Sequence, residues 1–268
     1  MTYQRILLRL FSSGLLARAG RRFLHDRVWT IEEGQGAGLK ISFPQNHDYV
    51  LGSSERPVQE ALGQQLHPGD VFFDIGANLG FFSLIGAKRV GSTGCVYSFE
   101  PVAGNAVSVR ENVRLNGLDN VGLFEVAVGR SSGSAELLLT EWNGGASLSS
   151  SAVKPSDPVS RRNVRVVALD DFIPAEKLRM PTFVKIDVEG LELEVIQGMT
   201  KTIATARPIL LYEVDDEKKD SFLRRWAELD EYVERLGYQI IHLEDSYPLL
   251  DWHVGHSLAL PRKHQDTN

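Results

Sequence analysis

Cysteine is almost absent from this sequence: Cys95 is the only one among 268 residues. A single cysteine excludes an internal disulfide framework and any metal site built from several cysteines. Cys95 begins an apolar run that predicts a buried strand, so we interpret it as a core residue. We expect an intracellular, cytoplasmic protein from this composition.

Long hydrophobic runs and an excess of basic residues are also missing. The chain is 43% hydrophobic and 24% charged, which is ordinary for a soluble globular protein, and its length suits one large α/β domain. The formal net charge of -6 argues against a chain-wide surface for nucleic acid, and we predict no nucleic-acid partner.

The N-terminal residues 3–24 are basic and amphipathic, with five arginines and no acid. Arg9 interrupts the apolar residues, so the segment is too short to span a bilayer and lacks the apolar region of a secretory signal. We expect a helix that packs on the domain or on a second subunit, which leaves an oligomer open. Weak contact with a membrane surface or an acidic partner is the alternative. We assign residues 1–54 to a helical and strand extension and 55–268 to the main domain.

From residue 71 onward, apolar runs alternate with helical patterns, which predicts a parallel sheet with crossover helices. The expected strands are 71–75, 95–99, 121–128, 183–188, 209–214, 239–243 and 257–260, and the expected helices are 79–90, 103–115, 191–204 and 221–236. Residues 133–170 break the alternation and predict a β insertion around a Gly/Ser/Pro-rich loop at 143–160. Short strands and a helix are expected over 29–60.

The turn after the first strand of this sheet has the pattern D-x-G-x-N-x-G, from Asp74 to Gly80. Gly76 and Gly80 lack side chains and allow a ligand to approach the backbone at the carboxyl end of the strand. Asn78 stands where a dinucleotide-binding turn has its second glycine. The acid Asp74 would repel a pyrophosphate but suits an ammonium group, such as that of S-adenosylmethionine (SAM). A tight turn with no ligand is the plainer interpretation.

Glu100 ends the next predicted strand, 20 residues beyond Gly80. A carboxylate at this place can accept hydrogen bonds from both ribose hydroxyls of a nucleoside. Glu100 and the preceding turn together predict a ribosyl cofactor, and the missing phosphate-binding pattern favours SAM over NAD.

Three ionisable residues, Lys185, Asp187 and Glu189, close a buried strand and should point the same way by alternation. Because such groups are costly to bury unpaired, the strand end is a candidate reaction centre, with a structural ion pair as the alternative. An alcohol needs help to lose its proton, and Asp187 and Glu189 are the candidate bases, with Lys185 orienting one of them. Glu213 ends the next strand and should face the same crevice.

Metal binding is not predicted, because no tight cluster of carboxylates is evident in the sequence. His242, His253 and His256 lie in the C-terminal segment. His242 falls within a predicted strand, where a structural role is favoured. His253 and His256 fall in a predicted loop and are weaker candidates for contact with substrate.

Several of these motifs together resemble the FkbM family of methyltransferases. They are Asp74-Ile-Gly-Ala-Asn-Leu-Gly80, Phe99-Glu-Pro101, Asn112-Val-Arg-Leu-Asn-Gly117, Ala127-Val-Gly129 and Lys185-Ile-Asp-Val-Glu-Gly190. The resemblance covers roughly residues 55–215. It implies a class I methyltransferase (Rossmann-like) fold, with a seven-stranded, mostly parallel sheet and helices on both faces. It also implies SAM as cofactor and O-methylation of a small-molecule, sugar or other glycan acceptor.

By this resemblance the turn holds the methionine part of SAM, Glu100 holds the ribose, and residues 125–127 lie along the edge of the adenine. The predicted cofactor residues are Asp74, Gly76, Ala77, Asn78, Gly80, Phe81, Glu100, Pro101, Asn105, Glu125, Ala127 and Asp187. The predicted catalytic residues are Lys185, Asp187, Glu189 and Glu213. Asn143 and Ser147 lie in a stretch that resembles the family's small-residue loop near the cofactor, where they could bond to SAM or the acceptor. A flexible surface loop is the alternative. An NAD-type oxidoreductase, a non-catalytic partner subunit and an RNA methyltransferase are the alternatives.

Overall fold

The computed structural model describes residues 27–42, 47–139, 147–149, 151, 158–248 and 252–262. The basic segment 3–24 and Asn143, for which the sequence made predictions, lie outside these residues. No helix among the described residues is long and apolar enough to cross a membrane.

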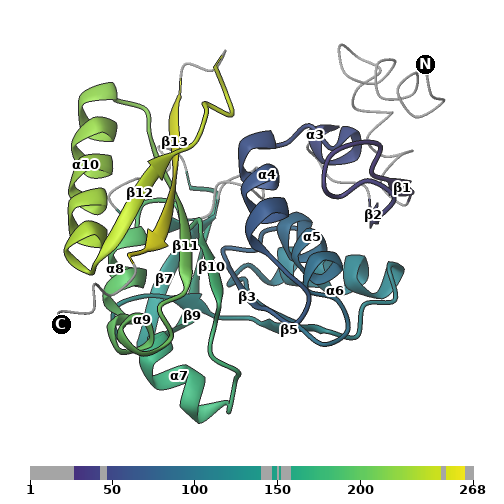
Figure 1. Ribbon diagram of the computed structural model, residues 1–268, viewed down its shortest axis with the longest axis horizontal. Helices are drawn as coiled ribbons and strands as arrows, with labels where there is room; N and C mark the ends of the chain where they lie inside the picture. Colours follow the sequence, from purple (N-terminus) through teal and green to yellow (C-terminus); the bar gives the residue numbers. More distant parts are fainter. Residues whose placement is uncertain are drawn as a thin grey trace, which may run out of the picture.

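A seven-stranded sheet forms the centre of the molecule (Figure 1). Its strands are β3 (Val71–Ile75), β4 (Cys95–Phe99), β5 (Val121–Phe124), β10 (Phe183–Ile186), β11 (Ile209–Asp216), β12 (Tyr238–His242) and β13 (His253–Pro261). Their order is β12-β13-β11-β10-β3-β4-β5, and only β13 runs antiparallel to its neighbours. All five residues of β3 are buried, as expected of a central strand covered on both faces. The predicted fold class is confirmed.

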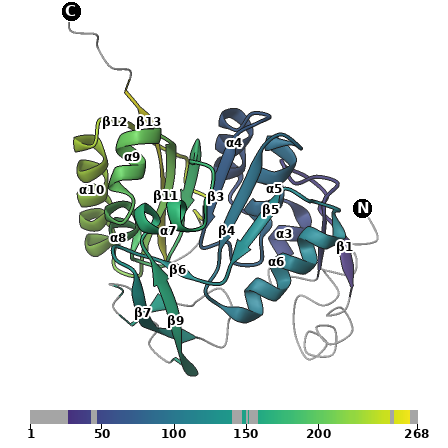
Figure 2. The ribbon, with the colours of Figure 1, turned by 90° about the horizontal axis from the view of Figure 1, so that it is seen from below.

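Helices cover both faces of this sheet (Figure 2). One face carries α4 (Arg56–Gln65), α5 (Phe81–Val90) and α6 (Ala103–Leu115); the other carries α7 (Leu169–Ala175), α8 (Glu192–Gln197), α9 (Thr200–Ala206) and α10 (Lys219–Arg235). Because successive side chains of a strand point to opposite faces of the sheet, the strands contribute residues to two separate cores. Phe72 belongs to the core under α4 and α5, whereas Phe73 belongs to the core under α7 to α10.

The described part of the N-terminal extension packs on the first of these cores. It forms a two-stranded antiparallel sheet, β1 (Val28–Thr30) and β2 (Lys40–Ser42), followed by α3 (His47–Leu51). Trp29 and Ile41 are buried in the same core as α5. The extension shares its core with the main domain, and the boundary after residue 54 stays a prediction.

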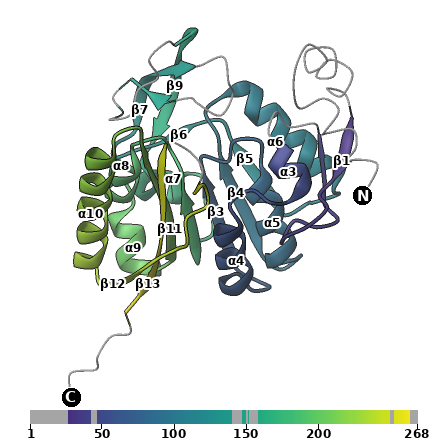
Figure 3. The same ribbon diagram turned by 90° about the horizontal axis from the view of Figure 1, so that it is seen from above.

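The β insertion forms a second sheet of its own, which projects beyond one end of the large sheet (Figures 2 and 3). It contains β6 (Ala127–Val128), β7 (Gly133–Leu139), β8 (Ser147–Leu148) and β9 (Ser160–Val167), in the order β6-β9-β7-β8. The predicted insertion is therefore confirmed.

Two predicted elements were wrong because each is divided in the structure. The strand expected over 121–128 breaks after Phe124, where the chain leaves the large sheet and residues 127–128 pair with β9 instead. The helix expected over 191–204 breaks at Gly198 into α8 and α9. A Cβ on Gly198 would lie 2.1 Å from the carbonyl oxygen of Gly129, so a close backbone approach accompanies this break.

Two strand ends also differ from the sequence prediction. The last strand is longer than the expected 257–260 and starts at His253. β10 stops at Ile186, two residues earlier than expected, and the left-handed residues Glu189 and Gly190 follow it.

Candidate cofactor and catalytic site

The turn that follows β3 brings the backbones of two strand ends into direct contact. Gly76 has φ 81°, and a Cβ at this position would lie 1.7 Å from the carbonyl oxygen of Asp187. Asn78 is also left-handed, with φ 50°, and Gly80 directly precedes α5. A glycine at position 76 is therefore required by both backbone conformation and space.

Glu100 follows β4 and is only 4% exposed. Its carboxylate accepts hydrogen bonds from the backbone N–H groups of Asn78 (2.7 Å) and Val102 (2.8 Å). Burial raises the pKa of Glu100 to about 7, although the two backbone hydrogen bonds oppose this rise. Each carboxylate oxygen keeps acceptor capacity beyond these bonds.

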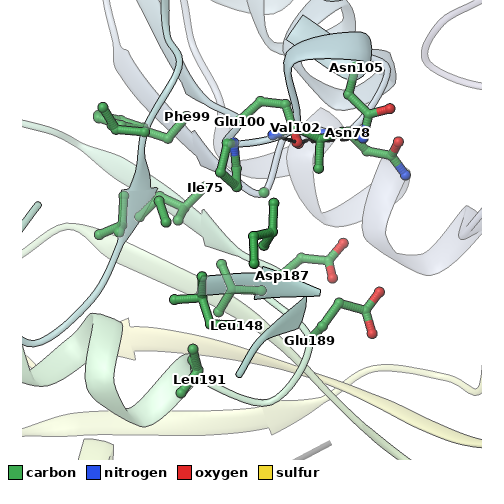
Figure 4. A pocket seen from close by; sticks show the side chains of 17 residues that line it. Ile75, Asn78, Phe99, Glu100, Val102, Asn105, Leu148, Asp187, Glu189 and Leu191 are labelled. Carbon is green, nitrogen blue, oxygen red and sulfur yellow. Dashed lines mark hydrogen bonds between the residues drawn. The ribbon is translucent and has the colours of Figure 1, made fainter. Parts of the chain in front are cut away.

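A pocket of about 670 Å³, including its open mouth, lies between the carboxyl ends of β3, β4 and β10 and the small sheet. Its polar side includes Gly76, Asn78, Glu100, Pro101, Asn105, Asp187 and Glu189. Its apolar side consists of Ile75, Phe99, Val102, Val126, Ala127, Val128, Leu137, Leu148, Val188 and Leu191. Figure 4 shows Asn78, Glu100 and Asn105 gathered on one side of the pocket.

Most of this apolar wall was missed by the sequence analysis. Leu137 and Leu148 come from β7 and β8, and their alternating pattern predicts strands but not which pocket those strands cover. Ser147, suspected as a polar contact, lies in β8, and its buried hydroxyl has no hydrogen-bond partner among the described residues.

The carboxylates of Asp187 and Glu189 point to the same side, across the pocket from Glu100 (Figure 4). Lys185 is buried beneath them, with its Nζ 2.8 Å from Oδ2 of Asp187 and 4.8 Å from the Phe82 ring centre. Burial alone would lower the pKa of Lys185, but Asp187, Glu55 and Asp74 outweigh it and raise the pKa. Lys185 is therefore a permanent cation that fixes the position of Asp187.

Glu189 has an unusual environment at the edge of the pocket. Its backbone is left-handed, with φ 56°. Burial raises the pKa of its carboxyl well above the usual value, and the nearby acids Asp215, Asp187 and Glu213 raise it further. A carboxylate in such surroundings holds a proton more strongly than an ordinary one.

Asp74 does not line the pocket, contrary to its expected place beside the methionine part of a cofactor. It alternates onto the face of the sheet that carries α5, is fully buried, and accepts a 2.5 Å hydrogen bond from Ser83. Burial raises its pKa, and Lys185 and Ser83 oppose the rise. Asp74 thus lies beneath the turn and supports it from the other side of the sheet.

Four other predicted cofactor residues also lie outside the pocket lining. Ala77 and Phe81 are buried where α5 begins, and the Phe81 ring stacks on Tyr49 at 4.7 Å. A Cβ on Gly80 would lie 3.2 Å from the side chain of Val109. Glu125 is partly exposed and pairs with Arg110 at the surface. The start of α5 thus turns Ala77 and Phe81 into the core, whereas Glu125 turns to the surface.

Glu213 lies near Asp187 and Glu189 but belongs to a different cluster. Oε2 of Glu213 lies 2.7 Å from Nε2 of His256, and Oε2 of Glu55 lies 3.5 Å from the same nitrogen. Burial, followed by the nearby Asp187, raises the pKa of Glu213 to about 8. Burial opposes protonation of His256, but the nearby carboxylates of Glu213 and Glu55 outweigh this and raise its pKa to about 10. Sequence analysis missed Glu55.

His242 and His253 both have structural surroundings. Nε2 of His242 lies 2.6 Å from Oδ2 of Asp230, and its ring packs on Trp226 at 4.4 Å. This agrees with the structural role expected for His242. His253 stacks on Phe222 at 5.9 Å, in β13 rather than in a loop.

The pocket fits a nucleoside cofactor such as SAM. Apolar side chains on one side suit an adenine ring, and Glu100 can accept hydrogen bonds from ribose hydroxyls on the other. The exposed backbone of the glycine turn and the acids at the mouth suit a methionine moiety with its ammonium group.

Known proteins with similar sequences point the same way. A family model described as the methyltransferase FkbM domain matches residues 74–240, well over half of the chain. The hexuronic acid methyltransferase AglP of Haloferax volcanii is 23% identical over 158 residues, which are 59% of this chain and 61% of that protein. The match thus spans less than two thirds of that relative's own length.

One further relative and one solved structure are also similar to this chain. The 2-O-methyltransferase NoeI of Sinorhizobium fredii is 29% identical over 216 residues, 72% of this chain and 86% of that protein. A crystal structure of a methyltransferase FkbM from Methylobacillus flagellatus superposes with a TM-score of 0.49 at 18% identity, covering 75% of this chain and 50% of that one.

Proposed function

Because the chain belongs to the FkbM family of methyltransferases, we propose that it transfers a methyl group from SAM to a hydroxyl of a sugar or other small-molecule acceptor. The observation that carries this proposal is Glu100, buried at the end of β4 with acceptor capacity facing a nucleoside-sized pocket. Asp187 and Glu189 stand across that pocket, where the acceptor would be activated.

The residues of the chain have separate tasks in this proposal. Glu100 holds the ribose, and Asp187, fixed by Lys185, orients the methionine part. Bound SAM supplies a methyl group on a sulfonium, which is an excellent leaving group. Alignment of the acceptor oxygen with that methyl then provides much of the rate enhancement.

Glu189 is the proposed general base for the acceptor hydroxyl. It lines the pocket, and its raised pKa makes it a stronger proton acceptor than an exposed carboxylate. Lys185 is a positioning residue, since it reaches the pocket only through Asp187.

The proposed acceptor class rests on the relatives. One is named for hexuronic acid and another for 2-O-methylation, so the expected acceptor is a hydroxylated sugar or sugar acid. An NAD-type oxidoreductase does not agree with the family to which the chain belongs.

The direct test is incubation with methyl-labelled SAM and a panel of sugars, uronic acids, other hydroxylated metabolites and RNA. For at least one acceptor we expect a labelled product, identified by mass spectrometry, whose mass increases by that of the labelled methyl group minus the hydrogen that it replaces. SAM binding without transfer to any member of the panel would favour the alternative that the chain is a non-catalytic partner subunit. Transfer only to RNA would favour the RNA methyltransferase.

A further inference from the structure

A second cluster of ionisable side chains lies outside the cofactor pocket, where β11, β13 and the start of α4 meet. It consists of Glu55, Glu213 and His256, and one ligand atom from each lies within 4.8 Å of the other two. Glu213 and His256 are direct partners across the antiparallel β11–β13 pair, so their side chains share one face. Glu55 precedes α4 in a left-handed conformation, with φ 44°.

The cluster is deeply buried, yet one of its oxygens lacks a hydrogen-bond donor. The side chains of His256, Glu55 and Glu213 are 1%, 8% and 15% exposed. Oε2 of Glu55 has no hydrogen-bond partner among the described residues, although it is directed at Nε2 of His256 from 3.5 Å. A buried carboxylate oxygen without a donor is costly, and a cation between the three groups would remove that cost.

The other oxygen of Glu55 is held in place from outside the cluster. The hydroxyl of Tyr247 donates a 3.0 Å hydrogen bond to Oε1 of Glu55. A hydrogen bond that orients a carboxylate while leaving its second oxygen open is the arrangement found behind metal ligands.

The surrounding charge also favours a cation. Asp187 follows β10 beside Glu213, and the nearby Lys185 already pairs with Asp187. A divalent cation at this place would balance the charge of both carboxylates.

We propose that Glu55, Glu213 and His256 form a binding site for one divalent cation of the Zn²⁺ type. One imidazole nitrogen and two carboxylate oxygens are a mixed ligand set that suits such an ion, and a tetrahedral ion keeps a fourth position open. The sequence predicted no metal site because its three ligands are distant from one another in the chain.

The site also gives the cation a place in the reaction. Because Glu213 lies near Glu189, the proposed base, an ion held by Glu213 is close to the acceptor side of the pocket. Its open position can bind the acceptor hydroxyl and lower the pKa of that hydroxyl. This role rests on the proposed function, whereas the binding of the ion does not.

The test begins with full-length protein treated with a chelator and dialysed, then titrated with Zn²⁺ at pH 8 by calorimetry. We expect one Zn²⁺ per chain, and visible absorption bands when Co²⁺ replaces it. His256→Gln and Glu213→Gln should each weaken Zn²⁺ binding by about 100-fold or more, since each removes a direct ligand. His253→Gln is the matched control on the same strand and should bind like the parent protein.

Folding of each variant is checked by circular dichroism. If His256→Gln does not fold, Glu213→Gln alone tests the loss of a ligand. Absence of stoichiometric binding, or equal binding by the parent and both ligand variants, would overturn the site. Zn²⁺ binding without methyl transfer would support the site and contradict only the proposed function. Methyl transfer without Zn²⁺ binding would support the proposed function and contradict the site.

Discussion

At the scale of single residues, the buried carboxyl of Glu100 links cofactor binding to pH. Its pKa is raised to about 7, so it loses its charge as the pH falls through neutrality. A protonated carboxyl turns one acceptor oxygen into a donor, which weakens hydrogen bonds from ribose hydroxyls.

We therefore expect SAM affinity to fall by up to about tenfold per pH unit below pH 7 and to level off above pH 8. Calorimetry between pH 5.5 and 8.5 (a range chosen to be about 1.5 units either side of the pKa) measures this. Glu100→Gln should bind more weakly at pH 8 and lose the pH dependence. Glu111→Gln, on the exposed side of α6, is the control. An affinity that stays constant with pH in the parent protein contradicts the ribose assignment.

Glu189 is the residue at which binding and chemistry can be separated. Glu189→Gln keeps the size of the side chain but removes the proton acceptor. Turnover should fall by about 10²- to 10⁴-fold, as for loss of a general base, while the SAM dissociation constant changes little. Steady-state kinetics and calorimetry on the same preparation measure the two effects.

Glu194→Gln, in α8 and outside the pocket lining, is the matched control for this variant. If Glu189→Gln instead loses SAM and keeps its turnover at saturation, Glu189 is a cofactor ligand and not the base.

At the scale of elements, the contact between the β3 turn and the end of β10 depends on Gly76. In Gly76→Ala the new Cβ meets the carbonyl oxygen of Asp187, and φ 81° is unfavourable for alanine. We expect a loss of at least about 2 kcal/mol in the free energy of unfolding, together with weaker SAM binding. Urea denaturation measures the stability.

Gly104→Ala is the opposite case, because Gly104 lies in α6 with nothing within 4 Å of a Cβ. This variant should be more stable by about 0.4–1 kcal/mol. A Gly76→Ala protein as stable as the parent would show that the turn can move away from β10.

Elements with a local signal were predicted well, and elements defined by distant contacts were not. The apolar run of β3 and the amphipathic pattern of α10 appear where expected. The division of residues 121–128 between two sheets was missed, because β-branched and apolar residues suit either sheet equally. The break at Gly198 follows from its contact with Gly129, about 70 residues away in the sequence.

At the scale of the whole molecule, the pocket joins the large sheet to the inserted sheet, so a cofactor in it should stabilise both. At a SAM concentration of about 100 times its dissociation constant, ligand binding contributes about 2.7 kcal/mol. This should raise Tm by about 5–10 °C for a chain of this size. Differential scanning fluorimetry measures the shift, with NAD at the same concentration as the control.

An equal shift with NAD would show that the pocket accepts any adenine nucleoside and would weaken the SAM assignment. The same measurement also tests Glu100. Glu100→Gln should reduce the rise in Tm that SAM causes, and any change in the Tm of the ligand-free protein should be smaller than that reduction.

The sequence by itself determined the α/β class, the strand ends that carry polar residues, and the family. These features depend on residues close together in the chain: a glycine turn, an acid after a strand, and apolar runs of strand length. Gly76, Asn78, Glu100, Asp187 and Glu189 were found in this way, and the structure brings all five to one pocket.

Only the tertiary structure decided which face each side chain occupies and which distant residues meet. The side chain of Asp74 lies on the face of the sheet opposite the pocket. Packing of β3 against α5 decides this orientation, and the motif does not. Glu55, Glu213 and His256 come from three separate elements, and no local pattern connects them. Such contacts arise when the chain folds on itself, so their energy is absent from any short stretch of sequence.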